Sequence, residues 1–191
     1  MSDKKERSNY IPTGPWQRLT SERVYETPWI SVYHETVITP AGTEGIYGVV
    51  HFKNTAVGVV PLDEDNNIWL VGQTRYTLNE YTWEIPAGGC PRGEDSLIAA
   101  QRELQEEVGL TAQRWEKLLD LQLSNSVTDE VGTIYLARDL SSTPQSLDAT
   151  EDIELRKLPL DEAIAMVDRG EITDVLSVAA LLKLARVIEK K

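Results

Sequence analysis

The stretch that decides the fold is Gly88–Leu110, which reads GGCPRGEDSLIAAQRELQEEVGL. Its middle has helical spacing, with Asp95 or Ser96 as the N-cap and Gly109 as the stop. On a helix that turns about 100° per residue, three glutamates share one face. These are Glu103, Glu106 and Glu107, and the adjoining face carries Leu97, Ala100, Leu104 and Val108. The apolar face is expected to pack on the core, which leaves the acidic face for solvent or for a ligand.

A solvated surface is the ordinary explanation of such an acidic face. A divalent cation is the competing explanation, because like charges three and four residues apart repel each other by a few tenths of a kcal/mol per pair, roughly. Mg²⁺ prefers carboxylate and carbonyl oxygens and serves phosphate chemistry. The residues around the glutamates distinguish these two explanations.

Their spacing resembles the signature of the Nudix hydrolase family. The order is Gly88, five residues, Glu94, seven residues, Arg102-Glu103-Leu104, one residue, Glu106-Glu107, one residue, Gly109-Leu110. Every fixed position of that signature is present. The resemblance implies an α+β class and a Nudix fold, in which a mixed β-sheet is sandwiched by helices. The alternating runs of residues 30–38 and 45–52 predict an N-terminal antiparallel β-sheet extension.

The same resemblance implies roles for individual residues. Metal ligation falls to Glu103, Glu106 and Glu107 together with the carbonyl of Ala87, and the implied cofactor is Mg²⁺, with Mn²⁺ as a substitute. Arg102 is expected to pair with Glu94 and Glu106 and hold the preceding loop against the helix. Gly88 and Gly89 are expected to form that loop, tight and close to the metal.

Segments outside the signature look like the branch that hydrolyses ADP-ribose and nucleoside-diphosphate sugars. The matching strings are Gln73-Thr74-Arg75-Tyr76 and Glu84-Ile85-Pro86-Ala87-Gly88-Gly89. The resemblance implies substrate contacts by Arg75, Glu84 and Trp29, the last stacking on the base. A surface arginine is the alternative for Arg75, and core packing is the alternative for Trp29.

Enzymes of this branch carry a further glutamate on a loop after the signature, and residues 124–130 occupy that place. Glu130 is the candidate general base or additional metal ligand, and Asp129 is the second candidate. A solvated loop acid is the alternative. The branch typically reads Ser-Pro-Gly at the start of this loop, whereas this chain has Ser124-Asn125-Ser126. A broader range of nucleoside-diphosphate sugars therefore fits this loop as well as ADP-ribose alone does.

The implied reaction is hydrolysis of the diphosphate of ADP-ribose or a related nucleoside-diphosphate sugar, which yields a nucleoside monophosphate and a sugar phosphate. GDP-mannose and dinucleoside polyphosphates are alternative substrates. Two other functions are disfavoured by the sequence. A non-catalytic domain that senses ADP-ribose generally lacks signature carboxylates that are all present here. The long N-terminal sheet and the lack of a basic patch argue against an enzyme for nucleoside triphosphates or capped RNA. The resemblance also implies a homodimer formed through the N-terminal sheet.

Composition narrows the class of protein. The 191 residues carry a net charge of −12, which disfavours nucleic-acid and membrane-surface partners. No apolar run is long enough to span a bilayer, and no secretory signal is recognisable, so the cytoplasm is the expected location. The one cysteine, Cys90, is interpreted as a buried thiol, and His34 and His51 as structural residues.

The pattern along the chain predicts three segments. Residues 1–14 are expected to be a flexible leader, 15–54 an N-terminal β-sheet subdomain for dimerisation and base binding, and 55–191 the hydrolase domain. Alternating and β-branched runs predict the strands, and three- and four-residue spacing predicts the helices. The predicted strands are 30–38, 45–52, 55–62, 68–73, 82–85, 117–123, 133–137 and 153–158, with 55–62 and 68–73 forming a hairpin; the later helices are 161–168 and 177–188.

Overall fold

The computed structural model describes residues 11–147 and 152–188 of the chain. It divides into two compact units. Unit 1 comprises Met1–Lys53 together with Ser124–Glu130, and unit 2 comprises Asn54–Leu123 together with Val131–Lys191. The loop at residues 124–130, predicted to carry an acid of the hydrolase domain, is thus grouped with the N-terminal segment.

Unit 1 contains a four-stranded antiparallel sheet in the order β1-β2-β3-β4. The strands are β1 (Ile11–Thr13), β2 (Trp16–Glu26), β3 (Ile30–Ile38) and β4 (Glu44–Phe52). The N-terminal antiparallel sheet is therefore confirmed. Of the predicted leader, residues 1–10 lie outside the described residues, and Ile11–Thr13 pair with β2.

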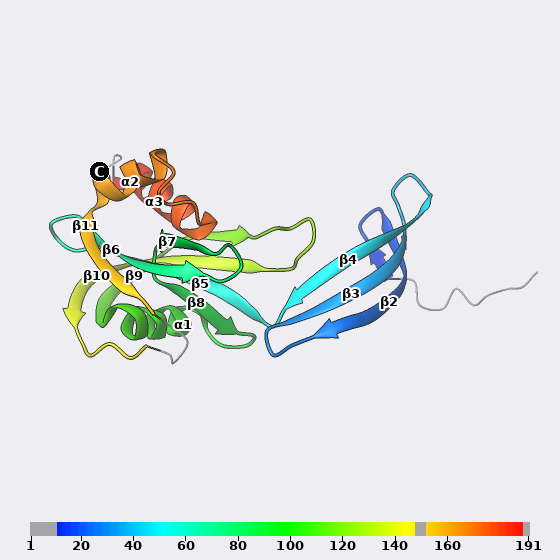
Figure 1. Cartoon of the computed structure of the whole chain (residues 1–191), viewed down its shortest axis with the longest axis horizontal. Helices are drawn as coiled ribbons and strands as arrows, with labels where there is room; N and C mark the ends of the chain where they lie inside the picture. Colours follow the sequence, from blue (N-terminus) through cyan, green and yellow to red (C-terminus); the bar gives the residue numbers. More distant parts are fainter. Residues whose placement is uncertain (1–10, 148–151, 189–191) are drawn as a thin grey trace, which may run out of the picture. The chain divides into compact units, whose positions relative to one another are not determined.

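Unit 2 contains two sheets with helices on both sides (Figure 1). One sheet has the order β8-β5-β10-β9 and the other the order β11-β6-β7, and among the described strands of this unit only β5 and β10 pair in parallel. The elements are β5 (Asn54–Pro61), β6 (Asn67–Arg75), β7 (Glu80–Glu84), β8 (Ala87–Pro91), α1 (Ser96–Glu103), η1 (Leu104–Val108), β9 (Leu110–Gln122), β10 (Val131–Ser142), β11 (Glu154–Pro159), α2 (Leu160–Asp168) and α3 (Val175–Ile188).

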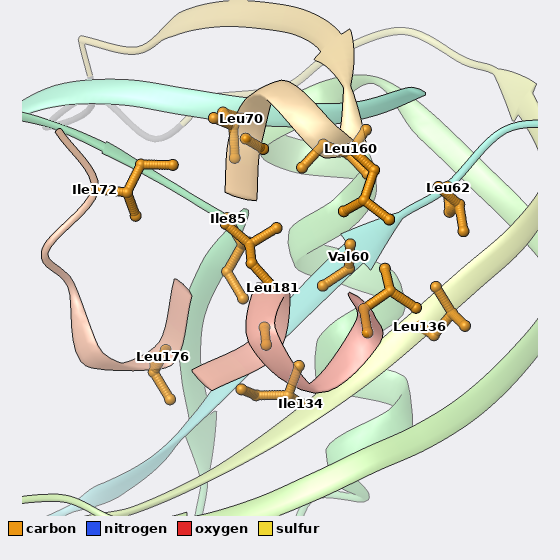
Figure 2. Packing of buried hydrophobic residues seen from close by; sticks show 14 of the residues in the cluster. Val60, Leu62, Leu70, Ile85, Ile134, Leu136, Leu160, Ile172, Leu176 and Leu181 are labelled. Carbon is orange, nitrogen blue, oxygen red and sulfur yellow. The ribbon is translucent and has the colours of Figure 1, made fainter. Parts of the chain in front are cut away.

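Strand β5 lies between two hydrophobic clusters because both of its faces are covered. Val57 and Val59 belong to the cluster that includes α1, whereas Val60 belongs to the cluster that includes α2 and α3. Figure 2 shows Val60 among side chains from the second cluster, including Leu160 and Leu181. A strand buried on both faces is typical of a parallel pair in the middle of a mixed sheet. The expected fold, a mixed sheet between helices, is confirmed.

Two details differ from the prediction. The predicted hairpin of 55–62 and 68–73 is wrong, because β5 and β6 belong to different sheets, and the antiparallel pairing between the two predicted segments is limited to the isolated Leu62–Ile68 bridge. The turn between them is nevertheless present, since Asp63 Oδ1 accepts a hydrogen bond of 2.7 Å from the Asn67 N–H. The predicted loop at Gly88 and Gly89 is also wrong, since both residues pair with β5 inside strand β8.

No helix within residues 11–147 and 152–188 is long and apolar enough to cross a membrane.

Candidate active site

The signature helix changes its geometry at the glutamates. Asp95 caps α1 by accepting a hydrogen bond of 2.8 Å from the Leu97 N–H. After Glu103 the helix becomes a π-helix, η1, and it ends at Gly109, whose φ of 68° is left-handed. A π-turn inside a helix is frequent at functional sites, and it alters the angular spacing that an ideal α-helix predicts. The backbone conformation is therefore unusual at the residues expected to hold metal.

Two of the three glutamates are buried. Glu103 is 6% exposed and Glu107 is 2% exposed, whereas Glu106 is only partly buried. Burying a carboxylate is costly unless hydrogen bonds, a cation or a metal compensates for its lost hydration. The solvated-surface explanation is therefore wrong for Glu103 and Glu107.

Both buried carboxylates lie against the start of β8. The Ala87 N–H donates a hydrogen bond of 2.8 Å to Glu107 Oε2. A Cβ atom added to Gly88 would lie 2.2 Å from the carboxyl carbon of Glu103, so the missing side chain of Gly88 makes room for that carboxylate. The structure thus brings Ala87, Glu103 and Glu107 together, although they come from a strand, an α-helix and a π-helix.

Arg102 connects this strand to the acidic helix. Its Nη1 donates hydrogen bonds to Glu103 Oε1 at 2.8 Å and Glu106 Oε2 at 3.0 Å, and its Nη2 donates to the Gly89 carbonyl at 2.8 Å. Burial alone would lower the pKa of Arg102, but Glu103 and Glu106 together raise it. Arg102 therefore remains a cation that neutralises part of the acidic cluster.

Glu94 reaches the same arginine less closely. Its Oε2 lies 3.9 Å from Arg102 Nη2, and this oxygen is buried without a hydrogen bond from the described residues. The expected Glu94–Arg102–Glu106 group is thus assembled, with Arg102 closer to Glu106 than to Glu94.

These donors fit a hard divalent cation. The buried carboxylates of Glu103 and Glu107 face the start of β8, and oxygen is the ligand that Mg²⁺ prefers. Within the described parts of the chain, no three His, Cys, Asp or Glu side chains form a group that could hold a metal ion by themselves. Mg²⁺ usually keeps several waters and takes few protein carboxylates, so additional oxygens from the backbone, water or a phosphate suit this arrangement.

A second ion pair lies beside the acidic group. Arg75 Nε donates a hydrogen bond of 2.9 Å to Glu84 Oε1, and its Nη2 pairs with Glu84 Oε2. Burial would raise the pKa of Glu84, but hydrogen bonds from Arg75 and Thr82 outweigh it and lower this pKa. The hydrogen bond with Glu84 raises the pKa of Arg75, and the charge of Glu107 adds to this effect. Arg75 is thus oriented by a buried carboxylate while its own side chain remains 41% exposed, and its contact with a substrate stays a prediction.

Replacing Arg75 with Met is expected to lower the free energy of unfolding by about 2 kcal/mol at neutral pH, because the buried Glu84 loses its counter-ion. The pKa of Glu84 is lowered by folding, so its stabilisation is present above the unfolded pKa of about 4.3 and is lost as the pH falls through the folded pKa. The difference between variant and wild type should therefore shrink in acid. Urea unfolding of both proteins at a series of pH values measures this difference in the free energy of unfolding.

The matched control is Arg114→Met, because Arg114 pairs with Asp139 on the surface and both side chains are well exposed. An exposed pair contributes little, so this control should change the free energy of unfolding by less than about 1 kcal/mol. Equal effects of the two substitutions would contradict the assigned role of the Arg75–Glu84 pair.

In unit 1, Trp29 lies in the turn between β2 and β3 and is 70% exposed. Core packing is therefore the wrong explanation for this residue. The Trp29 N–H donates a hydrogen bond of 3.2 Å to Thr27 Oγ1, and the Trp29 carbonyl accepts one from the Lys53 N–H. An exposed indole on a fixed backbone suits stacking on a flat ligand.

The two loop acids have different surroundings within unit 1. Asp129 accepts a hydrogen bond of 2.8 Å from the Phe52 N–H and interacts with His51 Nδ1 at 2.9 Å, which attaches the loop to β4. His51 is thus structural, as expected. Among the described residues of unit 1, none makes such a contact with the carboxylate of Glu130, and burial together with the charge of Asp129 raises the pKa of Glu130. Because Asp129 is used to attach the loop, Glu130 is the better candidate for chemistry.

Sequence reasoning missed a hydrogen bond to Ile85, which lies two residues before β8. Ser177 is fully buried, and its Oγ accepts a hydrogen bond of 2.9 Å from the Ile85 N–H and donates one of 2.8 Å to Asp174 Oδ2. Asp174 precedes α3 and could be recognised as a helix cap, but nothing local indicates that Ser177 reaches a residue 92 positions away. Cys90 is buried in the hydrophobic cluster around α1, as expected.

Comparison with known proteins agrees with this geometry. A family model described as NUDIX domain matches residues 52–178, and one described as nucleoside diphosphate sugar hydrolase N-terminal domain matches residues 16–50. An ADP-ribose pyrophosphatase of Mycobacterium tuberculosis is 34% identical over 87% of this chain and 82% of its own. An ADP-ribose pyrophosphatase of Bacillus subtilis is 30% identical over 85% of this chain and 89% of its own.

A solved structure described as an ADP compounds hydrolase has the same fold, with a TM-score of 0.82, 23% sequence identity and coverage of 91% of this chain and 94% of its own. The complete signature, the buried glutamates beside Ala87 and Gly88, and the family match over residues 52–178 lead to one assignment. The chain belongs to the Nudix hydrolase family.

Proposed function

We propose that this protein is a Mg²⁺-dependent pyrophosphohydrolase that cleaves the diphosphate of ADP-ribose or a related nucleoside-diphosphate sugar. The observation that carries the proposal is the pair of buried carboxylates, Glu103 and Glu107, held against the first residues of β8. The substrate class is supported by the two ADP-ribose pyrophosphatases and by the match of residues 16–50 to a nucleoside diphosphate sugar hydrolase N-terminal domain. A homodimer in the cytoplasm is part of the proposal.

Each residue then has a defined part in the reaction. Glu103 and Glu107, assisted by Glu106, would hold Mg²⁺ together with the Ala87 carbonyl, and Mn²⁺ could substitute. When bound there, such a metal would neutralise charge on the diphosphate and lower the pKa of water. Arg102 and Glu94 hold the signature helix against β8. Glu130 takes the proton of the attacking water or adds a ligand oxygen, and the products are a nucleoside monophosphate and a sugar phosphate.

Substrate binding is assigned to three further residues. Arg75 offers a guanidinium to phosphate or ribose, and Glu84 orients that guanidinium. Trp29 offers its exposed ring to the base. Because Ser124-Asn125-Ser126 replaces the Ser-Pro-Gly of typical ADP-ribose enzymes, the proposed range includes other nucleoside-diphosphate sugars.

A substrate panel tests the proposal. The protein is incubated with ADP-ribose, ADP-glucose, GDP-mannose or a diadenosine polyphosphate, and products are measured as phosphate released by an added phosphatase. We expect turnover of ADP-ribose or another sugar nucleotide with Mg²⁺ or Mn²⁺, no turnover in EDTA, and recovery when metal is restored. Ligand-induced thermal stabilisation without hydrolysis would favour a sensor, and no turnover of any compound would refute the proposal.

A further inference from the structure

The end of the signature helix is covered by the segment that follows β10, residues 143–146. The Thr143 N–H donates a hydrogen bond of 2.9 Å to the Gly109 carbonyl, and the Ser146 N–H donates one of 3.1 Å to the Glu106 carbonyl. The side-chain amide of Gln145 donates a hydrogen bond to the Glu107 carbonyl. The last carbonyls of a helix lack partners within it, so this segment supplies them.

The fit between the segment and the helix end is close. A Cβ atom added to Gly109 would lie 2.8 Å from the Thr143 carbonyl oxygen and 3.2 Å from the Gln145 nitrogen. Gly109 is left-handed and ends the π-helix, so the segment contacts the turn at which the backbone leaves the helix. The backbone of η1 therefore cannot move at its C-terminal end without disturbing residues 143–146.

Glu107 is held from two directions. Its carboxylate accepts the Ala87 N–H, and its backbone carbonyl accepts the Gln145 amide, which comes from 38 residues further along the chain. The first contact orients the side chain toward β8, and the second restrains the peptide from which that side chain projects. Residues that restrain metal ligands in this way commonly set metal affinity.

We infer that Gln145 is a positioning residue, which tunes the affinity of the metal site by restraining the backbone at Glu107. The inference rests on the proposed metal-binding role of Glu107. Among the three contacts from residues 143–146 described above, those of Thr143 and Ser146 use backbone N–H groups that most residues provide. Gln145 alone contributes a side-chain donor, so its substitution isolates this restraint.

The test is a titration of the purified full chain with Mn²⁺, in which electron paramagnetic resonance measures the concentration of free Mn²⁺. In Gln145→Met the donor is lost while the length of the side chain is kept. We expect the Kd for Mn²⁺ to rise about five-fold, with the number of sites unchanged. At saturating metal, the KM for the sugar nucleotide should change less than about two-fold. Gln145→Ala should behave in the same way.

Gln113→Met is the matched control, because Gln113 is an exposed glutamine on β9 away from this contact. It should leave the Kd for Mn²⁺ unchanged. An unchanged Kd in Gln145→Met overturns the inference, as does a fall in the number of sites at unchanged Kd, which would show only loss of folded protein. If the wild-type protein binds no Mn²⁺, the proposed metal site itself is refuted, and the inference with it.

Discussion

Glu107→Gln is expected to lower kcat for the sugar nucleotide by about a thousand-fold. A metal in such a site stabilises the transition state by several kcal/mol, and each 1.36 kcal/mol corresponds to a factor of about ten. The amide oxygen of glutamine can still accept the Ala87 N–H, so the local hydrogen bond is retained while the charge is removed. Steady-state kinetics at saturating Mg²⁺ measure the loss.

The same substitution should leave the metal-free protein at least as stable as the wild type. Glu107 is 2% exposed, and replacing a buried carboxylate by an amide removes a desolvation cost. Thermal unfolding in EDTA checks this, with Glu116→Gln as the control, because Glu116 is an exposed acid on β9. A near-normal kcat in Glu107→Gln would refute the role assigned to this residue.

Gly88→Ala is expected to lower kcat/KM by about a hundred-fold, because small displacements of a catalytic group have effects of this size. The new Cβ would lie 2.2 Å from the carboxyl carbon of Glu103, so that carboxylate must move. The contact is with the mobile end of a side chain, and we therefore expect little change in melting temperature. Kinetics over a range of Mg²⁺ concentrations measure the loss of kcat/KM, and thermal unfolding measures any loss of stability.

Gly48→Ala provides the comparison for that experiment. Gly48 also lies in a strand, and a Cβ added there meets nothing within 4 Å. Its activity and melting temperature should stay close to wild type. If Gly88→Ala retains activity within about three-fold of Gly48→Ala, then the position of Glu103 against β8 does not matter for the reaction.

Local signals predicted the signature helix well. Ala100, Leu104 and Val108 are buried as their spacing indicates, and Asp95 caps the helix. The switch to a π-helix after Glu103 could not be predicted, because it accompanies contacts with residues 143–146 that are distant in sequence. Angles calculated for an ideal α-helix consequently apply to α1 and not to Glu106 and Glu107.

The pairing of strands that are distant in sequence could not be predicted from local signals. A turn at Asp63 suggested a hairpin, but β5 pairs with β10 and β8, and β6 pairs with β11 and β7. The nearly continuous apolar run of Val57–Leu62 is itself typical of a strand buried on both faces. This pattern favours a strand in the middle of a sheet over one arm of a hairpin. Gly88 and Gly89 suggested a loop, whereas at Gly88 the absent side chain makes space for Glu103 within a strand.

The attachment of residues 124–130 to β4 has a consequence for building chimeric enzymes. Asp129 recognises the Phe52 N–H and His51, and Tyr47 donates a hydrogen bond of 2.5 Å to the Ser126 carbonyl. These contacts join residues 124–130 to β4, although the two segments are far apart in sequence. A chimera that takes its N-terminal sheet from a relative should therefore also take the loop at 124–130 from that relative. Otherwise the loop of this protein would contact a strand whose sequence differs from that of β4.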